Sequence, residues 1–306
     1  MNNITLRQLR YFDAVARHGH FGQAAAACAV SQPALSVQIK ELETTLGAPL
    51  FERNARQVRL TGIGDAFVTR VRSILRDVDE LGDLARAARS GLAGRLRLGV
   101  IPTIAPYLLP RIIARLGREY PGIDLQVRET LTDRLMCELL DGQLDTAIVA
   151  LPVSETALVE TPLFAENFVL VRPRADADQP IPSAEELRTM RLLLLEEGHC
   201  FRDQALSFCQ MQATLPRDGL DGSSLSTLVQ MVGAGIGVTL IPEMAVDVES
   251  NAAAVSVSRF TDTQPSRTIG LIWRKSSPLD PQLRQLAEIL RDCCAPNRTG
   301  ATATAA

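Results

Sequence analysis

The chain of 306 residues is long enough for two or three domains, and its 46% hydrophobic content and mean hydropathy of +0.07 indicate a folded protein. Nine Phe, three Tyr and one Trp offer little material for stacking on bases, which argues against a protein that binds single strands or RNA loops. No segment approaches the roughly 18 apolar residues of a membrane-spanning helix, and the first residues lack the apolar centre of a secretory leader. We therefore expect a cytoplasmic protein without membrane contact.

Charge is unevenly distributed, although the net charge is only −3. Residues 1–60 carry seven Lys and Arg against four Asp and Glu, a net of +3, so the remainder carries 25 against 31, a net of −6. A small basic segment on an acidic body is typical of a DNA-reading module joined to another domain. An excess of three charges also arises by chance, and the charges alone leave both interpretations open.

The N-terminal segment predicts three short helices followed by a hairpin. Apolar residues at helical spacing indicate a helix over 5–18, and an alanine-rich helix follows over 21–28. Ser31 is a typical N-cap for a third helix, with Pro33 in its first turn. Two helices joined by a short turn predict a helix-turn-helix, and the basic segment 49–61 predicts a hairpin that forms its wing.

This arrangement predicts a set of DNA contacts. Side chains near the start of the third helix are expected to reach base edges in the major groove, and arginines of the wing to contact phosphates or the minor groove. The predicted DNA-binding residues are Gln32, Pro33, Ser36, Gln38, Arg53, Arg56 and Arg59. The alternative for each is an ordinary solvated surface.

A regular apolar pattern follows the wing. Its members recur at spacings of 4, 3, 4, 3, 4 and 3, which is typical of a two-stranded coiled coil and predicts a dimer. They are Phe67, Val71, Ile74, Val78, Leu81, Ala85 and Ala88.

Beyond a hinge at 90–94, segments typical of strands and of helices alternate. Strands are expected at 96–101, 125–129, 146–151, 168–172, 192–195, 238–241 and 268–273, and helices at 106–119, 133–140 and 281–293. Such alternation predicts an α/β fold with a mainly parallel sheet and helices on both faces. About 200 residues suit two α/β lobes with a cleft between them, and the small polar tail from 297 onward is expected to be disordered.

Six cysteines are present, and none has the spacing of a zinc site, so we expect no metal and no cofactor. In a reducing compartment they should be thiols unless one pair is a transient redox couple. They are Cys28, Cys137, Cys200, Cys209, Cys293 and Cys294.

The N-terminal motifs FGQAA at 21–25, SQPALS at 31–36 and LFER at 50–53 resemble the winged helix-turn-helix of LysR-type transcriptional regulators. The resemblance implies a regulatory domain like the periplasmic binding proteins, a homodimer or homotetramer on double-stranded promoter DNA, and RNA polymerase as a partner. The implied boundaries are 1–62 for the DNA-binding domain, 63–91 for the linker helix and 92–306 for the regulatory domain. Within the last, one lobe spans about 92–163 and 268–296, and the other about 164–267.

A second resemblance lies in the regulatory part. The segment EGHCFRDQ at 197–204, followed by Cys209, is similar to the redox segment of the peroxide-sensing OxyR branch of that family. The segments IPT at 101–103, PYLLP at 106–110 and RTIGL at 267–271 are also similar, so the resemblance covers almost the whole chain.

The resemblance to this branch implies a role for seven residues. Cys200 would be the thiol that attacks hydrogen peroxide and Cys209 the thiol that then forms the disulfide, with a glutaredoxin or thioredoxin as reductant. The others are two polarising partners, two hydroxyls that hold peroxide and an arginine from a distant strand: His199, Asp203, Thr103, Thr132 and Arg267. The thiolate is the reactive form, and His199, Arg202 and a helix start are expected to favour it.

Helix geometry suggests how oxidation becomes a conformational change. If 200–209 is largely helical, nine steps place the two cysteine Cα atoms roughly 13 Å apart, whereas a disulfide needs about 4.4–6.8 Å. Condensation of a Cys200 sulfenic acid with Cys209 therefore requires local refolding, which we expect to alter a subunit interface and the spacing of the DNA-binding domains.

Plainer interpretations stand beside these. His199 could cap a helix, Thr132 could be the N-cap of the helix at 133, and Arg267 could form a surface ion pair. For the whole protein, two other functions remain open: a regulator of the same architecture whose cleft binds a small metabolite, and a thiol peroxidase. The first would show ligand-induced stabilisation, and the second sustained peroxide consumption with a reductant.

Overall fold

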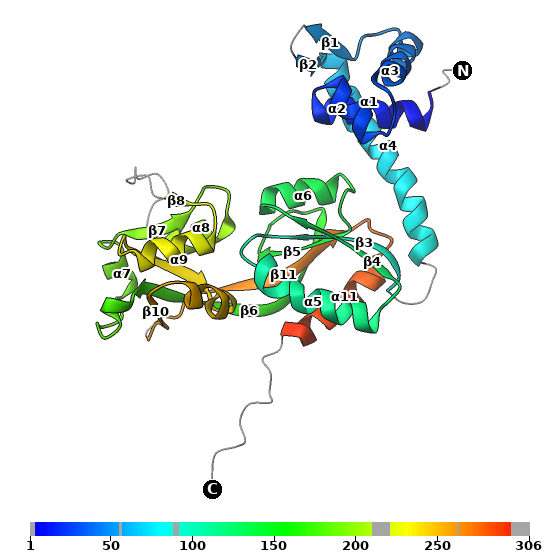
Figure 1. The fold of residues 1–306 in the computed structure, drawn as a ribbon. Coiled ribbons are helices and arrows are strands. Elements are labelled where there is room, and N and C mark those ends of the chain that lie inside the picture. The colour runs from blue at the N-terminus through cyan, green and yellow to red at the C-terminus, as the bar shows by residue number, and fades with distance from the viewer. Residues whose placement is uncertain (1–3, 55–56, 88–91, 210–220, 262, 295–306) are drawn as a thin grey trace. The chain divides into compact units, whose positions relative to one another are not determined.

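The computed structural model describes residues 4–54, 57–87, 92–209, 221–261 and 263–294. The chain divides into two compact units, residues 1–85 and 86–306 (Figure 1).

The N-terminal unit is a winged helix-turn-helix followed by a long helix, as predicted. Its elements are α1 (Leu6–His18), α2 (Phe21–Ala27), α3 (Gln32–Leu46), β1 (Phe51–Asn54), β2 (Gln57–Leu60) and α4 (Gly62–Ala87). Local chemistry sets the helix ends. Thr5 and Gln8 form a capping box at the start of α1. Gly19 adopts a left-handed conformation and ends this helix. The Ser31 hydroxyl accepts a hydrogen bond from the Ala34 N–H at the start of α3.

Aromatic rings form the centre of this unit. Phe12 is fully buried, and the centroids of the Phe51 and Phe67 rings each lie 5.2 Å from its own. Val71 of α4 is also fully buried in this core. The predicted coiled-coil pattern is therefore divided, because its first members pack within the unit, whereas Ile74 and Leu81 are 44% and 65% exposed.

The second unit is an α/β domain, which confirms the predicted fold class. Its strands are β3 (Gly94–Val100), β4 (Ile123–Glu129), β5 (Thr146–Leu151), β6 (Leu158–Pro173), β7 (Leu192–Leu195), β8 (Asp221–Gly222), β9 (Val238–Pro242), β10 (Val255–Ser258) and β11 (Ser266–Arg274). Its α-helices are α5 (Ala105–Glu119), α6 (Thr132–Leu140), α7 (Ala184–Leu187), α8 (Cys200–Phe208), α9 (Leu225–Gly233), α10 (Val246–Glu249) and α11 (Asp280–Cys294).

The sheet is mixed, so the expectation of a mainly parallel sheet was wrong. The strand order is β4-β3-β5-β11-β6-β9-β7-β8, with β10 paired to β6. Pairs at the two ends are parallel, whereas every pair that includes β6 or β11 is antiparallel. The prediction placed a strand only at 168–172, because the first part of β6 carries Glu160, Thr161, Pro162 and Glu166 among its apolar residues.

Two separate hydrophobic cores flank these central strands. The first, around the fully buried Trp273, defines lobe I, and the second, around the buried Phe168, defines lobe II. β6 and β11 run from one lobe to the other, side by side (Figure 1). Side chains near the middle of these strands therefore lie where the two lobes meet.

No helix of the described ranges is both long enough and apolar enough to cross a bilayer. Among the same residues, no three His, Cys, Asp or Glu side chains are grouped so as to hold a metal ion.

Candidate functional site

Helix α8 connects the two cysteines of the 200–209 segment, and its helical conformation confirms the prediction. Cys200 is its first residue, and Cys209 is the residue that caps its end. Cys200 is partly buried against the core of lobe I, whereas Cys209 is fully buried in the core of lobe II. One thiol therefore lies at each end of the helix, and each contacts a different core.

The Cys200 thiol lies in a narrow crevice where the lobes meet. This crevice brings together four of the seven predicted residues, Thr103, Thr132, His199 and Cys200. The remaining lining residues are Ile101, Pro102, Leu131 and Gly198. Hydroxyl and imidazole groups thus line the same crevice as the thiol, among otherwise apolar residues, and both kinds of group can form hydrogen bonds with a small polar molecule.

Among the residues that the structure describes, the Thr132 hydroxyl is the crevice group whose hydrogen bonding is unsatisfied. Leu131, not Thr132, is the N-cap of α6, so the capping interpretation was wrong. The Thr132 Oγ1 is buried and has no hydrogen-bond partner among the described residues. Such a buried hydroxyl costs about 1–3 kcal/mol unless something binds it.

Arg267 reaches Thr103 from β11 and is fully buried, so the surface ion pair was a wrong interpretation. Its Nη1 donates to the Thr103 Oγ1 at 2.8 Å, and its Nη2 donates to the Thr103 carbonyl oxygen at 3.1 Å. Its Nε and Nη2 pair with the carboxylate of Glu166, at 2.8 and 2.7 Å. The guanidinium also lies over the Phe201 ring, 5.3 Å from the ring centroid.

Glu166 was missed by the sequence analysis. It lies directly opposite Arg267 on the neighbouring strand, a relationship that depends on the register of β6 against β11. Its burial raises the pKa of its carboxyl, while Arg267 and the Met244 N–H act in the opposite direction. An acidic residue in an apolar strand is a cue for a buried partner, but the sequence does not identify that partner.

His199 and Arg202 do not supply the positive charge that we expected beside Cys200. Burial lowers the pKa of His199 below its usual 6.5, a shift that Glu196 only partly opposes, so the imidazole is neutral at pH 7. The Arg202 Nη1 donates to the Leu195 carbonyl oxygen at 2.7 Å and pairs with Asp221 at 2.9 Å. Of the three groups expected to favour the thiolate, the remaining one is the partial positive charge at the start of α8.

Asp203 does not join the crevice. Its side chain is exposed on α8, and it is not one of the residues that line either cavity beside Cys200. Residues three apart on a helix lie about 60° from each other around the axis, so helix geometry alone does not separate the two side chains; α8 packs so that Cys200 is partly buried and Asp203 is exposed. Asp203 is therefore not placed beside the thiol in this structure, and its role as a polarising partner stays a prediction.

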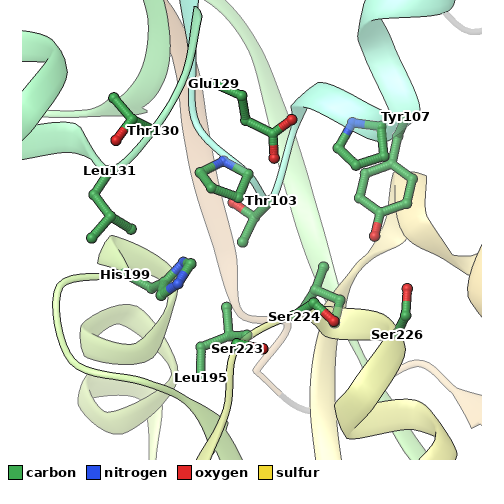
Figure 2. A pocket seen from close by; sticks show the side chains of 13 residues that line it. Thr103, Tyr107, Glu129, Thr130, Leu131, Leu195, His199, Ser223, Ser224 and Ser226 are labelled. Carbon is green, nitrogen blue, oxygen red and sulfur yellow. The ribbon is translucent and has the colours of Figure 1, made fainter. Parts of the chain in front are cut away.

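A larger cavity of about 380 Å³ opens beside the crevice and shares Pro102, Thr103, Leu131 and His199 with it. Figure 2 shows Glu129, Thr130 and Thr103 of lobe I facing His199 and the serines that precede and begin α9. These serines are Ser223, Ser224 and Ser226.

A hydrogen-bonded group at one end of this cavity joins the lobes. The Tyr107 hydroxyl donates to the Glu249 Oε1 at 2.7 Å, and the Ser226 hydroxyl donates to the same oxygen at 2.9 Å. Burial, followed by the Glu249 contact, raises the pKa of Tyr107 well above its usual value, so it remains a donor.

The N-terminal unit exposes several predicted DNA-binding side chains. Gln32 and Pro33 are exposed at the start of α3, and Ser36 is partly exposed. Gln38 is also partly exposed, and its Nε2 donates to the Glu41 Oε2 at 2.7 Å. Val37 lies between Ser36 and Gln38, is 54% exposed, and was omitted from the predicted DNA-binding residues. The available cue was an apolar residue outside the buried face of this helix, which carries Leu35, Ile39 and Leu42.

On the wing, Arg59 is exposed on β2. Arg53 lies on β1, but its side chain is outside the described set, as is Arg56 altogether.

The remaining cysteines lie apart from the crevice. Cys28 is half-buried in the N-terminal unit, where burial and then Asp13 raise the pKa of its thiol. Cys137 is exposed, and Cys293 accepts a hydrogen bond from the Arg115 Nη1 at 3.5 Å. The side chain of Cys294 is outside the described set.

Both units match known protein families. Residues 6–65 match the bacterial regulatory helix-turn-helix protein, lysR family, and residues 89–295 match the LysR substrate binding domain. The chain belongs to the LysR family. LysR-family membership shows a DNA-binding transcription regulator, as predicted, and the curated relatives place this LysR protein in the OxyR branch.

Two such relatives cover nearly the whole LysR chain. The probable hydrogen peroxide-inducible genes activator of Streptomyces viridosporus is 43% identical over 298 residues, which is 94% of each chain. The DNA-binding transcriptional dual regulator OxyR of Escherichia coli is 40% identical over 292 residues, covering 94% of this chain and 95% of that one.

Solved structures agree with this placement. A full-length OxyR variant from Pseudomonas aeruginosa has a TM-score of 0.72 and 38% identity, with 95% of this chain and 94% of that chain covered. A mutant OxyR from Corynebacterium glutamicum with hydrogen peroxide bound has a TM-score of 0.64 and 34% identity, with 94% and 92% covered.

Proposed function

We propose that this LysR-family protein is a hydrogen-peroxide-responsive transcription regulator whose Cys200 thiol reacts with peroxide. The observation that carries the proposal is the crevice, which brings Thr103, Thr132 and His199 to the Cys200 thiol. The Thr132 hydroxyl, which has no hydrogen-bond partner in the described part of the chain, supports the binding of a small polar molecule there.

In the first step, peroxide lies between the two threonine hydroxyls and the Cys200 thiolate. The sulfur attacks one peroxide oxygen, the O–O bond breaks, and the other oxygen leaves as hydroxide, which takes up a proton to become water. Cys200 becomes a sulfenic acid. The neutral imidazole of His199 can donate one hydrogen bond and accept another, and the start of α8 favours the thiolate.

In the second step, the Cys209 sulfur attacks the Cys200 sulfur, and the sulfenic oxygen leaves as water. The two thiols together lose two electrons, and one peroxide yields two water molecules. Helix α8 prevents this reaction while it is intact, because its nine steps separate the Cα atoms by roughly 13 Å, beyond the roughly 4.4–6.8 Å of a disulfide. The helix must unwind for the bond to form.

Unwinding of α8 would change the packing of both lobes. Cys200 contacts the core of lobe I, whereas Phe201 and Cys209 are buried in the core of lobe II. Drawing the cysteines together removes side chains from these positions, so the oxidised domain packs differently. A packed core converts such local change into a discrete rearrangement.

The rearrangement would be transmitted to DNA through the assembly. Residues 1–62 would bind promoter DNA, with Gln32, Pro33, Ser36 and Gln38 at base edges and Arg53, Arg56 and Arg59 at the backbone. Residues 63–91 would link two copies, since Ile74, Leu81 and Leu84 expose apolar side chains along α4. We place the regulatory domain at 92–306, with a dimer or tetramer, RNA polymerase and a glutaredoxin or thioredoxin as its partners.

The test compares DNA selection by the reduced and the peroxide-treated protein. Sheared DNA of the source genome is incubated with the full-length protein in each state, and bound fragments are sequenced, with Cys200→Ser as the control. We expect a set of promoter fragments whose protected length or enrichment changes with peroxide in the wild type only. Identical selection in both states by the wild type would contradict the proposal.

A second candidate function rests on the cavity of about 380 Å³ beside the crevice, which has the size of a small-molecule site. In that case a metabolite would be the effector and the cysteines would be incidental. Thermal stabilisation by a metabolite, with unchanged DNA selection after peroxide, would favour it. A thiol peroxidase would instead consume peroxide continuously with a reductant.

A further inference from the structure

Glu166 and Arg267 form a buried pair directly behind the crevice. Their Cα atoms are paired in the register of β6 and β11, the two strands that pass between the lobes. The side chains are 4% and 0% exposed. Glu166 is not one of the residues that line the crevice or the neighbouring cavity, so it would not touch a bound peroxide.

Hydrogen bonds link Met244 to Thr103 through the pair, with Glu166 accepting on both sides and Arg267 donating on both sides. The Met244 N–H donates to the Glu166 Oε1 at 3.2 Å, and the Glu166 Oε2 accepts from the Arg267 Nε at 2.8 Å. Arg267 then donates to the hydroxyl and to the carbonyl oxygen of Thr103. A guanidinium fixed on one edge by a carboxylate presents its other edge in a set orientation.

The orientation of the guanidinium determines whether the Thr103 hydroxyl acts as a hydrogen-bond donor or acceptor toward a molecule in the crevice. Guanidinium groups only donate, so the Thr103 Oγ1 must act as an acceptor toward Arg267. Its own hydrogen has no acceptor among the described residues and remains available to a guest in the crevice. Thr103 is thereby set as a hydrogen-bond donor toward peroxide.

We propose that Glu166 is a positioning residue for the reaction with peroxide: it holds Arg267 so that the Thr103 hydroxyl donates to the departing peroxide oxygen. The inference rests on the proposed function. As the Cys200 sulfur bonds to the near oxygen and the O–O bond breaks, negative charge develops on the far oxygen, which leaves as hydroxide and becomes water by taking up the proton that the Cys200 thiol released when it ionised. A donor fixed toward that oxygen stabilises the charge as it forms.

The test separates the peroxide reaction from the general reactivity of the thiol. Rates of Cys200 loss are measured in the full-length protein with hydrogen peroxide and, separately, with iodoacetamide, which needs the thiolate but not the Thr103 donor. For Glu166→Gln we expect the peroxide rate constant to fall about tenfold, with the iodoacetamide rate constant within about twofold of the wild type. The control is Asp145→Asn, a carboxylate that is 1% exposed, pairs with Arg97 and lies away from the crevice.

A double-mutant cycle then tests whether Glu166 acts through Thr103. Thr103→Val should slow the peroxide reaction, and adding Glu166→Gln to it should slow it by less than about twofold more. Independent, multiplying effects would overturn the inference. If Glu166→Gln does not fold, Glu166→Asp, which keeps the charge but shortens the reach, replaces it in both experiments.

The outcomes distinguish the two proposals. Equal losses with both reagents would show a purely structural role for Glu166 and overturn the inference, as would an unchanged peroxide rate. A wild-type protein that reacts with iodoacetamide but not with peroxide would refute the proposed function, and this inference with it.

Discussion

Cys200 and Cys209 lie at opposite ends of helix α8, the first against the core of lobe I and the second within the core of lobe II. The folded helix therefore keeps apart two thiols that are close in sequence. Any reaction that joins them must unwind the helix and change the packing of two cores. Because of this arrangement, formation of a disulfide between the two thiols would change the conformation of the domain.

Thr132→Val tests the partnerless hydroxyl. The substitution keeps the side-chain volume and removes a buried group without a hydrogen bond, so the free energy of unfolding should be unchanged or rise by about 1 kcal/mol. The peroxide reaction should nevertheless slow about tenfold, because the guest loses a partner. Urea unfolding and the rate of thiol loss measure the two effects.

The matched control is Thr146→Val. The Thr146 hydroxyl is fully buried and donates to the Ile272 carbonyl oxygen at 2.9 Å, so its loss should destabilise the fold by about 1–3 kcal/mol. It lies outside the crevice, and peroxide reactivity should be retained. A Thr132→Val protein that loses stability as Thr146→Val does would contradict our account of Thr132.

Arg267→Met should leave the Glu166 carboxylate buried and unpaired, at a cost of about 3–5 kcal/mol at pH 7. Burial already raises the pKa of Glu166, and without Arg267 the folded-state pKa rises further above the unfolded value. The carboxyl is then neutral at low pH, so the loss of stability should be smaller at pH 5 than at pH 7. Adding Glu166→Gln should restore part of the stability; a loss independent of pH would contradict this explanation.

For His199 we expect the opposite pH dependence of stability, with a loss of stability at low pH. Its folded-state pKa lies below the unfolded value of 6.5, because burial disfavours the charged ring. The unfolded chain therefore binds the proton first, and the contribution is complete above about pH 6.5 and lost as the pH falls through the folded-state pKa. In His199→Asn, the decrease in urea midpoint between pH 7 and pH 5 should be smaller than in the wild type, and an equal or larger decrease would be evidence against a neutral His199.

On DNA, the wing and the recognition helix should respond differently. Arg59→Ala removes an exposed charge on β2 and should weaken binding to all sequences, with the slope of log K against log salt reduced by about 0.9. Ser36→Ala, near the start of α3, should instead alter sequence preference and leave the slope unchanged. Salt titrations on a selected promoter fragment and on random DNA distinguish them, and an unchanged slope for Arg59→Ala would remove it from the phosphate contacts.

Leu81→Glu tests α4 as a dimer contact. Leu81 is 65% exposed, so the substitution should not unfold the N-terminal unit, but it places a charge in the proposed apolar seam. We expect the dimer dissociation constant to rise about 30-fold in sedimentation measurements, which corresponds to about 2 kcal/mol. The exposed Asp77 of α4 lies outside the repeating pattern, so Asp77→Ala should leave the dimer unchanged.

The sequence predicted the parts whose chemistry is local. The Ser31 cap and the periodicity of the helices predicted the N-terminal unit, and the motif around Cys200 indicated the resemblance to the OxyR branch. Relationships that depend on register were not predictable in the same way. Glu166 lies 101 positions from Arg267 and meets it only because β6 and β11 are antiparallel neighbours.

Two further discrepancies have physical causes. Asp203 is near Cys200 along the chain and a helix places residues three apart on the same general face, but which side chain is buried depends on how α8 packs against the lobes, and Asp203 is exposed. The charge of His199 depends on how deeply the folded protein buries the ring, which the residue type alone does not indicate.

The central claim is tested most directly by peptide mass mapping of the full-length protein before and after a stoichiometric dose of hydrogen peroxide, with Cys200→Ser treated in parallel. The account predicts the loss of two thiols in the wild type, a disulfide-linked peptide that joins Cys200 to Cys209, and no such peptide in the variant. An unchanged thiol count, or a bridge between other cysteines, would contradict it.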